Sequence, residues 1–167
     1  MSELFMSIGP TCRSAYHLRR RLNGEVVRGV FDWQVTPTAA LVQYLERDFR
    51  GVLDFLDLEQ TPLGVRNKRL DTLHPHLFRG PFPLSYPEAR AAHDRRCART
   101  RDALRADTPL VLCLSDPGQD EAALSAALRK YNPRLRYRFL SPVGGADGPD
   151  WRGNFVAWDE ALDHQRA

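Results

Sequence analysis

Apolar residues form short continuous or alternating runs in some segments and recur every three or four positions in others. The first pattern predicts strands and the second predicts helices, and the two alternate along the chain. Short continuous apolar runs at residues 4–8 and 110–114 are typical of buried strands. Residues 136–140 alternate polar and apolar side chains, as a strand covered on one face does. Apolar positions spaced by three and four predict helices over residues 12–22, 37–49 and 121–131, and a last short helix is expected at Ala161 and Leu162. Residues 87–104 predict a long, strongly charged helix rich in arginine and alanine, whose thin apolar face puts it on the surface over the sheet.

The last third of the chain says most about fold class, because residues 110–140 have the pattern of a strand, a helix and a second strand. A β-α-β unit of this kind belongs to a parallel sheet. We therefore predict an α/β fold with a central, mostly parallel sheet flanked by helices, in a single domain over residues 1–167. The length of 167 residues and the hydrophobic content of 43% suit one domain with a substantial core.

Local signals set several element boundaries. Thr36 followed by Pro37 predicts a helix with threonine as its N-cap and proline as its first residue. Apolar residues after Gly51 predict a further buried turn; they are Val52, Leu53, Phe55 and Leu56. Residues 58–83 are rich in proline and glycine and predict loops with short extended pieces, a setting in which functional side chains often lie.

Charge and cysteine content argue against several classes of protein, namely nucleic-acid-binding, membrane, disulfide-bonded and cysteine-zinc proteins. The net charge is +3, and 22 of the 24 basic residues are arginines, but acidic residues interleave with most of them, so we expect no nucleic-acid partner. No apolar run is long enough to span a bilayer and no signal peptide is evident, which predicts a cytoplasmic protein without membrane contact. Three cysteines without a C-x-x-C pair argue against disulfides and a cysteine zinc site, and we expect no cofactor.

Cys12 is the first candidate for chemistry. It follows the break Gly9-Pro10-Thr11 and opens a predicted helix, which puts its sulfur beside unpaired backbone N–H groups and the positive end of the helix dipole. This setting favours a thiolate, and the N–H groups of the turn from Gly9 to Arg13 could also hold an oxyanion. Cys97 and Cys113 lie in a charged helix and an apolar strand, and we assign them structural roles.

A nucleophilic cysteine needs a base, and the chain offers five histidines: His17, His74, His76, His93 and His164. His17 lies five residues beyond Cys12 on the same helix and points elsewhere, His93 is expected to be solvent-exposed on a charged helix, and His164 is close to the chain end. The bases left are His74 and His76. A metal site at these two histidines lacks a clear third ligand.

Two segments carry a resemblance to a known family: Ser7-Ile8-Gly9-Pro10-x-Cys12-Arg13-x-Ala15-Tyr16-x-Leu18-Arg19 and Phe31-Asp32-Trp33-x-x-Thr36-Pro37. They resemble a bacterial family of otherwise unknown function described as papain-like cysteine peptidases, most clearly over the first 55 residues. The resemblance implies that Cys12 is the nucleophile and that a histidine of the later segment is its base. It also implies a papain-like α+β fold as the alternative to parallel α/β.

The family's histidine is typically followed by aspartate and phenylalanine, whereas His76-Leu77-Phe78 lacks the acid. Asp32 becomes the best candidate for orienting the imidazole, with Asp71 and Asp116 behind it. Asp32 could equally cap the following helix or bond to the backbone. The base can still be either His74 or His76.

The preferred interpretation is a cysteine-nucleophile acyl-transfer enzyme with Cys12, His76 and Asp32 in its site. With water as acceptor it is a peptidase or amidase, and with an amine it is an acyltransferase. The expected substrate is a small-molecule or peptide acyl compound, and delivery by an acidic acyl-carrier protein suits the arginine-rich surface. The alternative is a catalytically degenerate member of the family that acts as a binding module through the same cleft.

Overall fold

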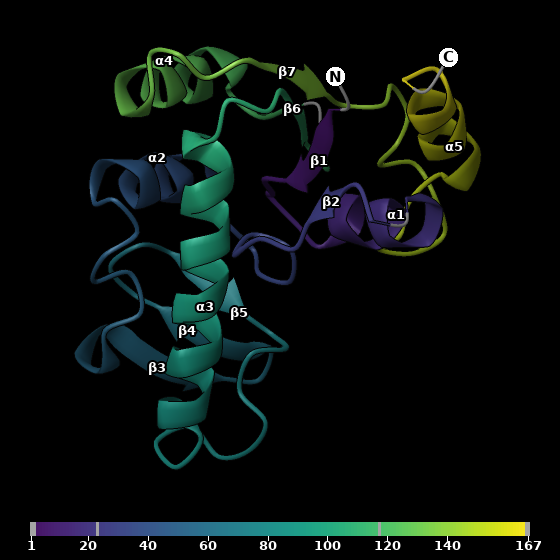
Figure 1. The fold of residues 1–167 in the computed structure, drawn as a ribbon. Helices are drawn as coiled ribbons and strands as arrows, with labels where there is room; N and C mark the ends of the chain where they lie inside the picture. Colours follow the sequence, from purple (N-terminus) through teal and green to yellow (C-terminus); the bar gives the residue numbers. More distant parts are fainter. Residues whose placement is uncertain (1–2, 23, 117, 166–167) are drawn as a thin grey trace.

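The computed structural model describes residues 3–22, 24–116 and 118–165 (Figure 1). Within these residues the chain forms a four-stranded and a three-stranded sheet. The strands are β1 (Leu4–Ser7), β2 (Val26–Val27), β3 (Leu58–Thr61), β4 (Gly64–Asn67), β5 (Thr72–His74), β6 (Leu110–Cys113) and β7 (Tyr137–Leu140). The helices are α1 (Arg13–Arg21), α2 (Thr38–Glu46), the short 3₁₀ helix η1 (Phe55–Asp57), α3 (Tyr86–Arg105), α4 (Glu121–Tyr131) and α5 (Phe155–Asp163).

The larger sheet has the strand order β2-β1-β6-β7, and all its strands are parallel. Its two central strands are the continuous apolar runs, which pair from Leu4 with Leu110 to Ser7 with Cys113. The predicted α/β fold with a parallel central sheet is therefore confirmed. The second sheet, β3-β4-β5, is antiparallel and comes from the segment predicted as loops and short extended pieces.

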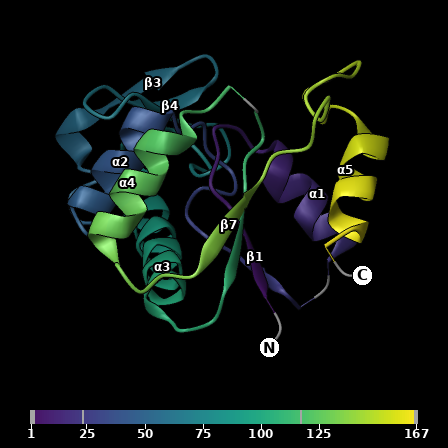
Figure 2. The same cartoon turned by 90° about the horizontal axis from the view of Figure 1, so that it is seen from above.

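Helices cover both faces of the parallel sheet (Figure 2). Phe5 and Val111 belong to one buried cluster, which they share with Leu18 of α1 and Trp158 of α5. The alternate residues of the same strands, such as Met6, belong to the cluster on the opposite face, where α2, α3 and α4 pack. This alternation is what a parallel sheet buried on both faces requires.

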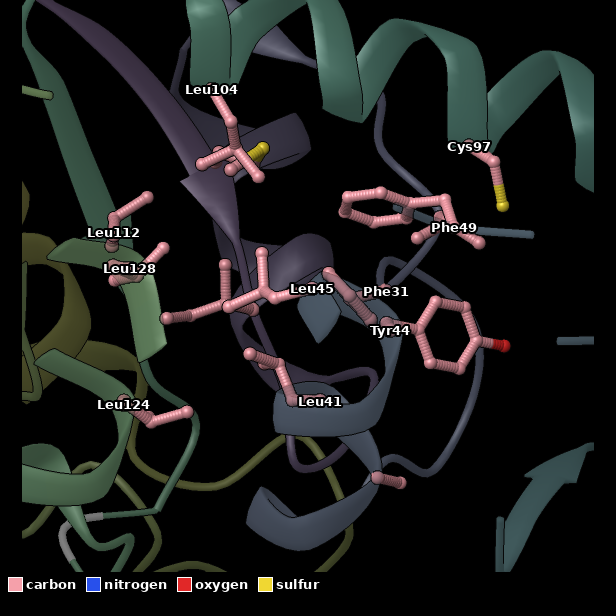
Figure 3. Close-up of a cluster of buried hydrophobic side chains, with 14 of the residues drawn as sticks. Phe31, Leu41, Tyr44, Leu45, Phe49, Cys97, Leu104, Leu112, Leu124 and Leu128 are labelled. Atoms are coloured by element: carbon pink, nitrogen blue, oxygen red, sulfur yellow. The ribbon is translucent and has the colours of Figure 1, made fainter. Parts of the chain in front are cut away.

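The larger cluster joins three helices to the sheet (Figure 3). Leucines from β6, α2 and α4 meet in it, and the rings of Phe31, Tyr44 and Phe49 pack beside them. Cys97 of α3 faces these rings and is buried, in agreement with the structural role predicted for it. Cys113 is completely buried on the other face, within the cluster around Trp158.

The helix α3 differs from its prediction in one important respect. His93 was expected in solvent, but it is 1% exposed and belongs to the buried face of the helix, with Ala89, Cys97, Thr100 and Leu104. His93 Nε2 lies 3.1 Å from the Tyr44 hydroxyl, and Cys97 Sγ lies 3.5 Å from His93 Nδ1. A buried histidine is tolerated here because both ring nitrogens have partners.

Two other boundaries also differ from expectation. α2 begins at Thr38 with Pro37 in the N-cap position, one residue later than predicted. Thr36 is buried and does not cap the helix; its hydroxyl accepts a hydrogen bond from Gln34 Nε2 at 2.9 Å. The apolar turn predicted after Gly51 is only half buried, because Leu56 is 87% exposed while Val52 and Leu53 lie in the interior.

In the described part of the chain, no helix has both the length and the apolar character needed to cross a bilayer.

Candidate functional site

The turn between β1 and α1 is held by backbone bonds on both sides. The Ser115 N–H donates to the Gly9 carbonyl at 2.8 Å, and the Thr36 N–H donates to the Pro10 carbonyl at 2.8 Å. Gly9 has φ +89°, and a Cβ atom there would lie 3.3 Å from the Thr36 carbonyl oxygen. A glycine is thus required for both backbone conformation and space. The turn delivers Cys12 to the N-cap position of α1.

This turn lies where the connections of the parallel sheet diverge. The helix that follows β1 packs on one face of the sheet, and α4, which follows β6, packs on the other. Open α/β sheets bind ligands at such a point, in the crevice outside the carboxyl ends of the strands. Cys12 follows β1 and Ser115 follows β6, and the Thr11 N–H joins the two loops by donating to Ser115 Oγ at 2.9 Å.

A pocket of about 390 Å³ opens at this point. Its wall is formed by Thr11, Cys12, Arg13, Val35, His76 and Trp151. The structure therefore brings together Cys12 and His76, the nucleophile and one of the two bases expected from sequence. His74 is not on this wall: it is 1% exposed, bonded to Thr72 Oγ1 at 3.0 Å, and burial lowers its pKa to about 3.

Sequence reasoning did not select Arg13 and Trp151 as site residues. Arg13 donates from Nη1 to the Ser115 carbonyl at 2.7 Å and from Nε to the Trp151 carbonyl at 3.0 Å. The Trp151 ring packs edge-on against Tyr16, with centroids 5.4 Å apart, yet it remains 53% exposed. An exposed tryptophan in a glycine-rich loop was the available signal, because large exposed aromatics often mark binding surfaces.

Cys12 is 9% exposed, and its electrostatics differ from the sequence-based expectation. Burial raises the pKa of the thiol to about 11, although its own backbone N–H works in the opposite direction. The negative charge of Asp32 adds to the increase. The expected stabilisation of a thiolate at the helix start is therefore outweighed by desolvation, and the sulfur is protonated at neutral pH.

Asp32 is buried, and its carboxylate forms no hydrogen bond or ion pair with the imidazole of His76. Its Oδ2 lies 3.3 Å from Nη2 of Arg19, and its Oδ1 has no hydrogen-bond partner in the described part of the chain. Burial raises the pKa of Asp32 to about 6, against the effect of Arg19. The capping alternative is not realised, because α2 has no side-chain cap. That Asp32 orients His76 stays a prediction.

The two reserve acids have partners of their own. Asp71 accepts from Arg66 Nη2 at 2.7 Å, and Asp116 Oδ1 accepts from the Gly118 N–H at 2.9 Å. Neither carboxylate forms a hydrogen bond to His76. Within residues 3–22, 24–116 and 118–165, the His76 ring has no hydrogen-bond partner at all.

An indirect chain of contacts nevertheless connects Asp32 with His76. The Arg19 guanidinium, which pairs with Asp32, lies 4.8 Å from the centroid of the Trp33 ring. Trp33 in turn meets His76 edge-on, with ring centroids 6.1 Å apart. The segment Phe31-Asp32-Trp33 is thus connected to His76 by the contact of the Trp33 ring, and Asp32 is connected to Trp33 through Arg19.

The described residues contain no arrangement of three or more His, Cys, Asp or Glu side chains that could hold a metal ion. Comparisons with known families, curated proteins and solved structures find no match for this chain. The candidate site therefore depends on its own geometry, namely a thiol and an imidazole on one pocket wall. The resemblance to papain-like cysteine peptidases remains a prediction.

Proposed function

We propose that this protein is an acyl-transfer enzyme in which Cys12 is the nucleophile and His76 is the base. The observation that carries the proposal is that both side chains line one pocket at the carboxyl ends of β1 and β6. The apolar wall made by Val35 and Trp151 suits the acyl group. A pocket of about 390 Å³ is in the range of small-molecule sites, which favours a compact acyl substrate over an extended peptide.

The raised pKa of Cys12 determines the order of proton transfer. Because the thiol is neutral at rest, His76 has to take its proton while the sulfur attacks the acyl carbon. A thioester forms, the bond to the leaving group breaks, and His76 returns the proton to the leaving group. Water or an amine then attacks the thioester, gives its proton to His76, and the thiol is restored.

The oxyanion formed in each step needs a hydrogen-bond donor. In the turn before α1, the Thr11 N–H is already taken by Ser115 Oγ and the Arg13 N–H lies 3.4 Å from Thr11 Oγ1. The Cys12 N–H, which already lowers the pKa of its own sulfur, is the remaining donor beside the nucleophile. We assign it the oxyanion.

A binding module with the same pocket is the second candidate. The observation in its favour is the pKa of Cys12, which burial raises to about 11, where an activated thiol would have a lowered value. In this case the pocket holds a ligand and the thiol only contributes to its wall. The two functions differ in what Cys12 does with an acyl donor.

The test is acylation by p-nitrophenyl acetate, followed by release of p-nitrophenolate and by intact mass. We expect one acetyl group on Cys12, none on the buried Cys97 and Cys113, and a loss of about 100-fold or more in rate for His76→Gln. His164→Gln, a change at an exposed histidine outside the pocket, is the matched control. Acetylation of Cys12 at the rate of a free thiol, unaltered in His76→Gln, would establish the binding module instead.

A further inference from the structure

A second hollow, of about 340 Å³, lies beside the Cys12 pocket and is surrounded by arginines. Its charged wall consists of Arg79, Arg95, Arg96 and Arg99, with Glu88 as the single acid. His76 lines both this hollow and the Cys12 pocket. The proposed base therefore stands on the shared wall between an apolar cavity and a strongly basic one.

The arginines converge because of their spacing on α3. Glu88, Ala92, Arg95, Arg96 and Arg99 recur at intervals of three and four, which puts them on one face of the helix. Arg79 joins them from the loop after β5, three residues beyond His76. A helix face and a loop thus close around the same space.

These arginines have no acidic partner at salt-bridge distance in the described part of the chain. Others are paired with acids, as Arg90 is with Asp94 on α3 at 3.0 Å and Arg105 with Asp48 at 2.7 Å. Among the described residues, Arg79, Arg95 and Arg96 form no salt bridge. Arg99 donates only to the backbone carbonyl of Arg28, at 2.9 Å. With Glu88 as the one acid on its wall, the positive charge around the hollow is only partly compensated.

Arg96 experiences this imbalance most directly. Its side chain is partly buried, and the charges of Arg19, Arg99 and Arg79 all lower its pKa in addition to burial. Asp32 acts in the opposite direction, but its carboxylate is shared with Arg19. A bound anion would relieve the repulsion between these guanidinium groups.

We propose that the arginine hollow binds the phosphate group of the acyl substrate. A phosphate carries close to two negative charges and offers three acceptor oxygens, which several guanidinium forks can engage at once. A carboxylate would offset only one of the charges. The proposal that the hollow binds phosphate depends on the arginines alone. The proposal that this phosphate belongs to an acyl substrate rests on the function proposed for Cys12 and His76.

Phosphate binding is tested by thermal unfolding in increasing inorganic phosphate at constant ionic strength and neutral pH. Wild type should show a saturable rise in Tm, because a ligand that binds only the folded state stabilises it. We expect Arg96→Gln to weaken the apparent affinity about tenfold or more, and Arg129→Gln, at an exposed position on α4, to keep it. No saturable rise in wild type, or an equal rise with acetate, would overturn the phosphate site.

The substrate class is tested with two thioesters that differ only in a phosphate, S-acetylpantetheine and its 4′-phosphate. The phosphorylated thioester should acylate Cys12 at least about tenfold faster, and Arg96→Gln should remove this advantage while Arg129→Gln preserves it. Equal rates in wild type would overturn the phosphate-bearing substrate. If the acyl-transfer function itself fails, acylation of Cys12 by p-nitrophenyl acetate and by both thioesters is unaltered in His76→Gln, while Cys12→Ala still shows the rise in Tm with phosphate.

Discussion

The carboxylate of Asp32 lies 3.3 Å from the guanidinium of Arg19, and the two ends of this ion pair have very different surroundings. The Asp32 side chain is buried, whereas the Arg19 side chain is 39% exposed. Water hydrates the Arg19 guanidinium but not the Asp32 carboxylate. Burial therefore raises the pKa of Asp32 to about 6 despite the nearby positive charge of Arg19. The pair connects the segment Phe31-Asp32-Trp33 to α1, and it has a measurable consequence for stability.

The stability of the folded protein should fall as pH rises from about 4 to 6, as far as Asp32 is concerned. The folded state holds the Asp32 proton more tightly than the unfolded state, whose aspartate has a pKa near 3.9, so stability is highest below that value and decreases until about 6. Two pKa units correspond to ~3 kcal/mol. Asp32→Asn should remove this decrease, as measured by urea unfolding at a series of pH values.

The control for this experiment is Asp107→Asn, at an exposed aspartate. It should leave the pH dependence of the unfolding free energy as in wild type. A wild-type curve and an Asp32→Asn curve that run parallel between pH 4 and 6 would show that the Asp32 carboxyl is not perturbed by its burial.

The buried His74 should make the protein sensitive to acid. Burial lowers its pKa to about 3, so the folded state holds the imidazole neutral while the unfolded state takes up a proton below pH 6.5. The contribution of neutral His74 to the free energy of unfolding is therefore fully present above pH 6.5. It is lost progressively as pH falls, by ~2–3 kcal/mol at pH about 4.5. His74→Gln should reduce the loss of unfolding free energy between pH 6.5 and 4.5.

A contribution of the same sign comes from His93, whose pKa is lowered well below its ordinary value by burial and by the charge of His74. The difference between His74→Gln and wild type measures His74 together with its effect on His93, and His164→Gln serves as the exposed control. If His74→Gln and wild type lost equal stability on acidification, the buried imidazole would not be the origin of the sensitivity.

Patterns local in sequence predicted the framework of this fold. The apolar runs at residues 4–8 and 110–114 became the two central parallel strands, because a strand buried on both faces is mostly apolar. The turn with Gly9 also led correctly to Cys12 at the start of α1. These features depend on neighbours in the chain, which the sequence displays directly.

Features that depend on contacts between residues far apart in the sequence could not be predicted from local patterns. The burial of His93 in an arginine-rich helix follows from Tyr44 and Cys97 as partners for its two ring nitrogens, and helical spacing alone does not reveal a Tyr44 contact. The pKa of Cys12 likewise depends on how completely the folded chain covers the sulfur, and no sequence signal measures that. The ion pair of Asp32 with Arg19 was not predicted, because it too joins residues that come together only in the folded chain.

Arg13 should be important for holding the pocket wall together. Its guanidinium joins the loop after β6 to the loop before α5 by donating to the carbonyls of Ser115 at 2.7 Å and Trp151 at 3.0 Å. Arg13→Met keeps most of the side-chain length but loses both bonds, and we expect it to cost ~1–3 kcal/mol of unfolding free energy. Limited proteolysis should then cut the loop around Trp151 faster.

Arg129→Met on α4 is the matched variant, because Arg129 is exposed and forms no salt bridge within the described residues. It should unfold like wild type and leave the proteolysis rate unchanged. Equal protease resistance of Arg13→Met and Arg129→Met would mean that the loop before α5 is held by its aromatic contacts, such as that between Trp151 and Tyr16, and not by Arg13.

Gly153 should tolerate substitution far less than Gly24, although both have left-handed backbone conformations, with φ +72° and +88°. A Cβ atom at Gly153 would collide with the Gly145 carbonyl oxygen and crowd the Arg13 side chain, whereas at Gly24 it would meet nothing within 4 Å. Gly24→Ala should therefore cost only the backbone strain, ~1–2 kcal/mol. Gly153→Ala must in addition displace the loop that carries Trp151, so we expect a larger fall in Tm and a changed tryptophan emission. Equal Tm values for the two variants would show that the loop that carries Trp151 accommodates the added Cβ atom at no cost in stability.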